Sequence, residues 1–161
     1  HIHGLAQATA GREVPVYVTE MGYPDYSGRG GVSEERVALY LARFLLLADT
    51  RAYLGGVWWY CLRDQGEDAR NKEHRFGVMS ATLQPKPAAR VLRALTQLLG
   101  QGQRLADQSS ATRHRVVGRR SDGSALELSW TENDADTQLL NDIAALDARP
   151  EAPFALRSLG R

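Results

Sequence analysis

The chain has 161 residues, 43% of them apolar, which is enough for a globular core. Its 20 basic and 19 acidic side chains give a net charge of +1, so the charge gives no reason to expect nucleic acid or an anionic membrane as partner. No apolar run approaches the roughly 18 residues of a membrane span. The single cysteine, Cys61, excludes an intrachain disulfide and a metal site built from several cysteines.

The first third of the chain alternates helical and extended patterns. Residues 1–10 carry apolar side chains at i, i+3 and i+4 spacing, which predicts the end of an amphipathic helix. The apolar, β-branched run at residues 14–19 predicts a parallel strand covered on both faces. Turn-forming residues fill segment 21–32, which predicts a loop. Ser33 is a suitable N-cap, and a helix is expected from there to about residue 50.

The next elements complete a repeating unit. Residues 57–62 predict a second buried strand, and strand, helix and strand in this order imply a right-handed parallel βαβ unit. Segment 63–86 shows little periodicity, and it is longer than the 12 to 15 residues at which plain loops become uncommon. We therefore expect this loop to be functional. A further helix is predicted over residues 87–99.

The pattern changes beyond residue 104. Residues 113–118 and 125–131 flank a turn and predict a β-hairpin, in which alternate residues share one face. The residues expected on that face are Leu126, Leu128 and Trp130. Residues 132–152 predict no defined element, and a strand is expected around residues 154–156. We therefore predict a small β-rich appended domain after the α/β part.

Glu20 is the residue whose position indicates chemistry. It directly follows the first apolar strand and precedes Met21 and Gly22, where glycine lets the chain turn away. In parallel barrels the ends of the strands carry the catalytic residues. A retaining glycosidase needs one ionised carboxylate as nucleophile and a second carboxyl group about 5 to 5.5 Å away as acid and base. The alternative is that Glu20 forms an ordinary ion pair with a helix or loop.

Several strings resemble glycoside hydrolases of the clan A (β/α)8-barrel type, in particular family 39. Residues 16–22, VYVTEMG, resemble the end of the seventh barrel strand, where the glutamate is the nucleophile. Residues 59–66, 73–78 and 85–88, WYCLRDQG, EHRFGV and PKPA, are similar to the run through the eighth strand, its loop and the last helix. The resemblance covers residues 12–100.

The resemblance implies an α/β fold that is the C-terminal portion of a (β/α)8 TIM barrel, residues 1–103, followed by the β-rich appendix, residues 104–161. A complete barrel takes about 250 residues, so this chain supplies only part of one. The family's acid/base glutamate follows an asparagine, and no Asn-Glu pair occurs in this sequence. We therefore expect a fragment whose partner is the remaining N-terminal barrel segment, which would carry the acid/base residue.

The implied activity is cleavage of O-glycosidic bonds in an oligo- or polysaccharide by double displacement, with Glu20 as nucleophile and Trp59 in the sugar platform. Aromatic faces suit the C–H faces of sugars. Trp58 and Trp59 should point to opposite sides of their strand, and we expect Trp59 to face the barrel interior.

Four more residues are candidates for substrate binding. Asp64 and Glu73 either bond sugar hydroxyls or pin the long loop through ion pairs with neighbouring arginines. Tyr23 and Tyr26, in the loop after Glu20, either line the cleft or are exposed loop aromatics.

No cofactor and no metal are expected, because the histidines lack ligand spacing. The family implies secretion or a periplasmic location, although the first residues lack the features of a signal peptide. Two alternatives stay open: a non-catalytic carbohydrate-binding or scaffold module, and a different α/β enzyme that shares only the βαβ unit.

Overall fold

The computed structural model describes residues 2–99, 103–120, 123–133, 135 and 137–147. The elements, in chain order, are α1 Ile2–Ala10, β1 Val16–Met21, α2 Glu34–Asp49, β2 Leu54–Trp59, the 3-10 helix η1 Lys72–Arg75, α3 Pro87–Leu99, β3 Ala106–Asp107, β4 His114–Arg119, β5 Ala125–Trp130 and α4 Gln138–Asp147. β1 and β2 pair in parallel, and β3, β4 and β5 form an antiparallel sheet in that order.

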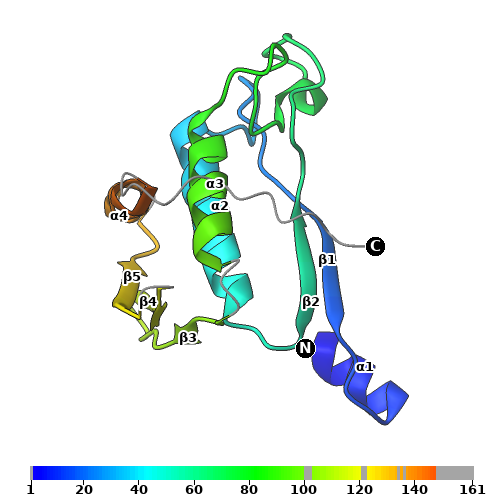
Figure 1. Ribbon diagram of the computed structural model, residues 1–161. Helices are drawn as coiled ribbons and strands as arrows, with labels where there is room; N and C mark the ends of the chain where they lie inside the picture. Colours follow the sequence, from blue (N-terminus) through cyan, green and yellow to red (C-terminus); the bar gives the residue numbers. More distant parts are fainter. Residues whose placement is uncertain (1, 100–102, 121–122, 134, 136, 148–161) are drawn as a thin grey trace, which may run out of the picture.

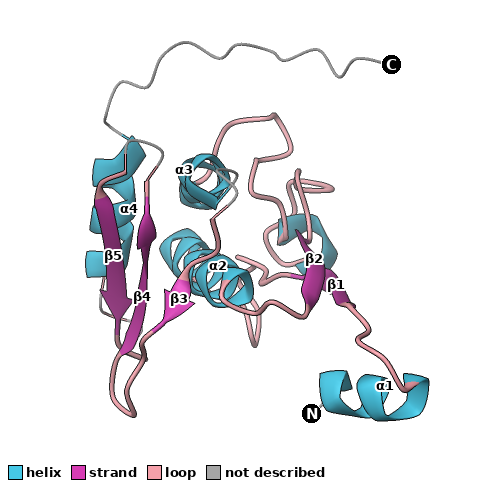
Figure 2. Cartoon of the chain, turned by 60° about the horizontal axis from the view of Figure 1, so that its bottom comes forward, coloured by secondary structure: helices cyan, strands magenta, loops and turns pink. Residues whose placement is uncertain are grey.

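The elements stack in three layers. Figures 1 and 2 show α2 and α3 side by side, with the parallel strands on one side and the antiparallel sheet and α4 on the other. This is a mixed α/β arrangement, as the sequence predicts, and it contains the expected unit of strand, helix and parallel strand. Closure into a barrel stays a prediction, because the described parallel sheet has two strands.

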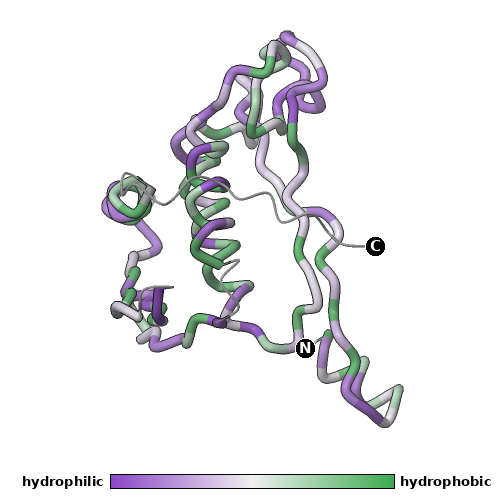
Figure 3. Tube along the Cα trace, viewed as in Figure 1, coloured by the Kyte–Doolittle hydropathy of each residue, from purple (hydrophilic) through white to green (hydrophobic). Residues whose placement is uncertain are grey.

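α2 and α3 carry the core between the two sheets. Figure 3 shows hydrophobic residues along both helices and mostly hydrophilic residues in the loops beyond the ends of β1 and β2. Ser33 caps α2 as predicted, because its hydroxyl accepts the N–H of Arg36 at 3.3 Å. The residues that α2 buries are Val37, Ala38, Leu39, Leu41, Ala42, Leu46 and Ala48. They extend around much of the helix, as packing between two layers requires.

β2 begins and ends three residues earlier than the sequence pattern predicts. Gly55 and Gly56 lie inside the strand, and Gly56 pairs with Tyr17 of β1. After Trp59 the chain pairs with its own loop, since the N–H of Cys61 donates to the carbonyl of Phe76 at 3.1 Å. The expected strand over 57–62 is thus wrong in its bounds, because the two glycines belong to the strand.

α1 confirms the predicted first helix. It ends at Gly11, whose φ of 62° suits glycine and whose N–H donates to the carbonyl of Gln7 at 2.9 Å. The helix buries none of its described residues: Ile2 and Leu5 are 73% and 57% exposed. α1 therefore presents an apolar surface to its surroundings.

The C-terminal part contains the predicted hairpin and one helix that the sequence pattern did not predict. β4 pairs with β5, and the three expected residues of β5 are buried: Leu126, Leu128 and Trp130. The additional helix is α4, in which Leu139 and Ile143 follow helical spacing and are fully buried. The strand expected around residues 154–156 lies outside the described residues.

The proposed boundary between residues 103 and 104 falls between α3 and β3. Buried side chains from both sides of it form one hydrophobic cluster, in which Leu95 of α3 and Val116 of β4 are both fully buried. The C-terminal elements therefore pack directly on the α2–α3 layer. In the part of the chain that the structure describes, no helix is long and apolar enough to cross a membrane.

Candidate functional site

Glu20 lies where β1 and β2 end side by side. The N–H of Tyr60, directly after β2, donates to the carbonyl of Met21 at 2.8 Å and so joins the two strand ends. Gly22 permits this approach, because a Cβ at this position would lie 2.1 Å from the carbonyl oxygen of Tyr60. The position of Glu20 is therefore fixed by the backbone contacts between the end of β1 and Tyr60.

An irregularity in β1 changes the direction of Glu20. Val18 pairs with Val57 and Met21 pairs with Trp59, so β1 advances by three residues where β2 advances by two. Such an extra residue re-aims side chains, and it is common beside active sites. Val18 is half-buried, whereas Glu20 and the residue before it are both exposed. Because of this extra residue, the Glu20 side chain does not lie on the half-buried side of β1.

The Glu20 carboxylate makes no hydrogen bond and no ion pair within residues 2–99 and the later described segments. Its side chain is exposed. The alternative of an ordinary ion pair therefore has no support from the described contacts, and the carboxylate is accessible to a ligand.

Trp58 and Tyr17 form an exposed aromatic pair on β2 and β1. They are 53% and 54% exposed, and their ring centroids lie 6.3 Å apart at an interplanar angle of 35°. Two glycines make room for the rings: a Cβ on Gly55 would lie 2.6 Å from the Tyr17 ring, and one on Gly56 would lie 2.8 Å from the Trp58 ring. The aromatic pair therefore lies close against the backbone of β2.

Trp59 points to the other side of β2, toward α2. Its ring lies 6.2 Å from that of Phe44 on α2 and 6.3 Å from that of Tyr23, which in turn lies 4.7 Å from Tyr40. The two tryptophans thus point to opposite sides, as expected. The expectation that Trp59 faces the barrel interior is corrected: Trp59 packs toward Phe44 of α2, and Trp58 is the exposed tryptophan of β2. Tyr23 is half-buried in the same aromatic contact.

Asp64 is enclosed in a group of four charged residues, Asp25, Asp64, Arg75 and Lys86, which we call the charge cluster. Asp64 is 1% exposed, and its carboxylate accepts the N–H of Gly77 at 2.7 Å. The other oxygen of Asp64 lies 2.6 Å from Nζ of Lys86 and 3.4 Å from Arg75. Asp64 therefore pins the long loop, which is the second of the two roles expected for it.

Asp25 completes the charge cluster from the loop after β1. Its carboxylate lies 2.7 Å from Nε of Arg75 and 2.7 Å from Nζ of Lys86. Glu34 borders the cluster at 3.8 Å from Arg75. Burial raises the pKa of Glu34, and the charge of Asp25 acts in the same direction. Sequence reasoning did not single out Asp25 or Lys86, although Lys86 lies in the PKPA string.

Glu73 and Tyr26 each form a hydrogen bond with a residue close in sequence. Glu73 lies in η1 with an exposed side chain, and the side chain of Asn71 caps its N–H at 3.0 Å. The hydroxyl of Tyr26 donates to the carbonyl of Arg29 within the same loop. Among the described residues, no group of three or more histidine, cysteine, aspartate or glutamate side chains could hold a metal ion.

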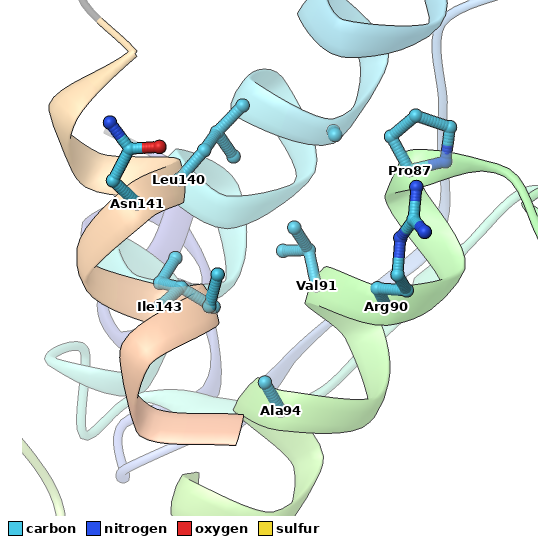
Figure 4. Close-up of a pocket in the computed structure, with 9 residues that line it drawn as sticks. Pro87, Arg90, Val91, Ala94, Leu140, Asn141 and Ile143 are labelled. Atoms are coloured by element: carbon cyan, nitrogen blue, oxygen red, sulfur yellow. The ribbon is translucent and has the colours of Figure 1, made fainter. Parts of the chain in front are cut away.

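Two pockets lie away from Glu20. One, of about 270 Å³, lies between α3 and α4, and Figure 4 shows Val91 and Ala94 of α3 facing Leu140 and Ile143 of α4. The other, of about 210 Å³, lies between the C-terminal half of α2 and the first residues of β2. Neither is lined by Glu20 or by the aromatic pair.

These features define a mixed α/β protein with an accessible carboxylate at the end of a parallel strand. No family model and no curated protein matches the chain. A solved structure is similar: a family 39 glycoside hydrolase from the gut symbiont Bacteroides cellulosilyticus WH2, with a TM-score of 0.65 and 24% sequence identity. The match covers 82% of this chain and 27% of that protein. The chain therefore has the fold of one part of a glycoside hydrolase.

Proposed function

We propose that this chain is the C-terminal portion of a retaining glycoside hydrolase barrel, and that Glu20 is the nucleophile. One observation carries the proposal: an exposed carboxylate without a described partner stands at the joined ends of two parallel strands. The likeness to part of a family 39 glycoside hydrolase supports the same assignment. The substrate class is an oligo- or polysaccharide.

In the proposed reaction, the Glu20 carboxylate attacks the anomeric carbon while the bond to the leaving oxygen breaks. A carboxylic acid outside this chain gives its proton to that oxygen. The resulting carboxylate then takes a proton from water, and the water oxygen displaces Glu20 from the anomeric carbon. Glu20 suits the first step because no positive side chain within the described residues neutralises it.

The aromatic pair is the proposed sugar platform. A pyranose ring packs its C–H faces on aromatic rings, and its hydroxyl groups bond polar partners at the rim. Trp58 supplies the larger exposed face, and Tyr17 extends it along β1. This assignment replaces the expected role of Trp59, because Trp59 packs against Phe44.

The proposed partner of the chain is the remaining N-terminal segment of the barrel. Parallel sheets occur almost only with both faces covered, and two strands cannot close a barrel. The side of β1 and β2 that carries Tyr17 and Trp58 is open, and Ile2 and Leu5 of α1 are exposed as well. A polypeptide that covers these apolar surfaces would also bring the acid/base residue. Secretion or a periplasmic location remains an expectation from the family.

The test compares Glu20→Gln with wild type in the intact protein that contains this chain. The assay is hydrolysis of a panel of aryl glycosides. We expect turnover to be abolished, while Glu35→Gln, an exposed glutamate of α2, retains it. A 2-deoxy-2-fluoro glycoside with a reactive leaving group should label Glu20 in wild type, as peptide mass spectrometry would show. Undiminished hydrolysis by Glu20→Gln, or a label on another residue, would refute the assignment.

The exposed aromatic pair also favours a second candidate, a non-catalytic carbohydrate-binding module. In that case Trp58→Ala abolishes oligosaccharide binding, measured by titration calorimetry, while wild type and Glu20→Gln bind equally and neither hydrolyses the sugar. If wild type hydrolyses the sugar and Glu20→Gln does not, the result supports the hydrolase and excludes the binding module.

A further inference from the structure

The loops after β1 and β2 are bound to each other along their length. We call residues 22–32 the first loop and residues 60–86 the second loop. The N–H of Asp25 donates to the carbonyl of Arg75 at 3.0 Å, and the N–H of Ser27 donates to the carbonyl of Ala69 at 2.8 Å. Because only Met21 separates Glu20 from the first loop, the position of Glu20 depends on where the second loop holds that loop.

Lys86 links both loops through its charge. It is 5% exposed, and its Nζ lies 2.7 Å from the Asp25 carboxylate of the first loop and 2.6 Å from the Asp64 carboxylate of the second. Lys86 directly precedes Pro87, the first residue of α3. Lys86 therefore contacts Asp25 and Asp64 from a position next to the first residue of α3, and α3 is anchored in the core.

The charges of the cluster balance, and this makes its geometry specific. Asp25 and Asp64 supply two negative charges, and Arg75 and Lys86 supply two positive charges. Buried charges of this kind are stable only when each has a close partner, because desolvation otherwise outweighs their attraction. A shift of the first loop relative to the second would separate the Asp25 carboxylate from Lys86. The cluster thus permits one relative position of the two loops.

From this geometry we infer that Lys86 is a positioning residue: through Asp25 and Asp64 it holds the first loop on the second and so fixes the direction of Glu20 beside Trp58. The inference rests on the proposed function for the role of Glu20. The contacts between the loops do not depend on it, so loop order and sugar chemistry can be measured separately.

The decisive variant is the double substitution Lys86→Met with Asp64→Asn. It removes one charge of each sign, so Asp25 and Arg75 still balance, and the carboxamide oxygen introduced at position 64 can still accept the N–H of Gly77. Lys86→Met alone leaves two carboxylates facing one arginine, and this variant could fail to fold. Lys72→Met is the matched control, because Lys72 lies in the same loop with an exposed side chain, and its Nζ lies 5.6 Å from the centre of the Phe76 ring and outside the charge cluster.

The first measurement is hydrogen exchange of single amides in the intact protein. In the double variant we expect the amides of Asp25 and Ser27 to exchange at least about tenfold faster, while buried amides of α2 such as that of Leu39 keep their wild-type rates. Lys72→Met should leave all these rates unchanged. Wild-type exchange at Asp25 and Ser27 in the double variant would overturn the inference. Equal acceleration in the loops and in α2 would also overturn it, since it reports only lower global stability.

The second measurement is labelling of Glu20 by the fluorinated glycoside. We expect the maximal labelling rate of the double variant to fall at least about tenfold while the concentration for half-maximal rate changes little, because a misdirected nucleophile slows the chemical step more than it weakens binding. A wild-type labelling rate in the double variant would refute the positioning role. If wild type itself is not labelled while the exchange result holds, the hydrolase proposal fails and the link between the loops stands.

Discussion

Gly22 lies where the end of β1 passes closest to the end of β2, and Gly22→Ala tests this contact. The added Cβ would lie 2.1 Å from the Tyr60 carbonyl oxygen, and an ordinary contact of 3.4 Å would need a shift of about 1.3 Å. The obstacle is backbone, so a side-chain rotation cannot relieve it. The shift would also strain the hydrogen bond from the Tyr60 N–H to the Met21 carbonyl, now 2.8 Å long.

The expected loss of stability follows from these two effects. Overpacking costs about 1 to 3 kcal/mol, and a lost hydrogen bond about 1 kcal/mol more. We therefore expect Gly22→Ala to lower the free energy of unfolding by about 2 to 4 kcal/mol. Urea unfolding followed by tryptophan fluorescence measures this difference, since the chain contains three tryptophans and two of them lie next to this contact.

Gly4→Ala is the matched control. Gly4 lies in α1, and apart from its chain neighbours and the helix backbone no described atom lies within 4 Å of an added Cβ, so alanine should leave stability unchanged or raise it by up to about 1 kcal/mol through helix propensity. Equal stabilities of Gly22→Ala and Gly4→Ala would show that β1 and β2 do not approach as described. In that case the fixed direction of Glu20 would lose its physical basis.

Two further predictions concern the antiparallel sheet. Trp130 is 1% exposed and stacks on His114 at 5.3 Å, so Trp130→Ala should lower the free energy of unfolding by about 3 to 5 kcal/mol; a loss below about 1 kcal/mol in urea would contradict its burial. Bonds from the hydroxyl and N–H of Ser109, together with Arg51 at 2.9 Å, hold the pKa of Asp107 below its ordinary value of 3.8. Its contribution is therefore present above that value and lost as the pH falls through the folded pKa. Asp107→Asn should be less stable than wild type by up to about 1 kcal/mol at pH 7, and this difference should shrink as the pH falls below 3.8; a difference that does not shrink with falling pH would exclude this cause.

Local patterns were sufficient for most of the elements. The N-cap at Ser33, the end of the first helix at residue 10 and the alternation in β5 depend on neighbouring residues, and the structure confirms all three. The bounds of β2 depend on a contact with β1 that is distant in sequence, because Gly55 and Gly56 are inside the strand to make room for other side chains. Sequence patterns alone treat such glycines as turns.

The candidate site also has one part that local sequence patterns predict and another part that they do not. Glu20 could be selected from the sequence, because its place after an apolar run is a local feature. The choice between Trp58 and Trp59 could not be made from the sequence, because it depends on which side of β2 packs against α2. The charge cluster was also beyond sequence reasoning: Asp25 and Lys86 are 61 residues apart and meet only because two loops fold onto one helix end.

The two glycines beneath the aromatic pair set the height of its rings above β2. Alanine at position 55 or 56 would place a methyl group within 3 Å of a ring of Tyr17 or Trp58 and push it outward, leaving both rings chemically unchanged. The height and tilt of the rings would then vary without loss of either aromatic side chain. A small library at these two positions would therefore change the shape of this exposed surface while Glu20 and its loop remain unchanged.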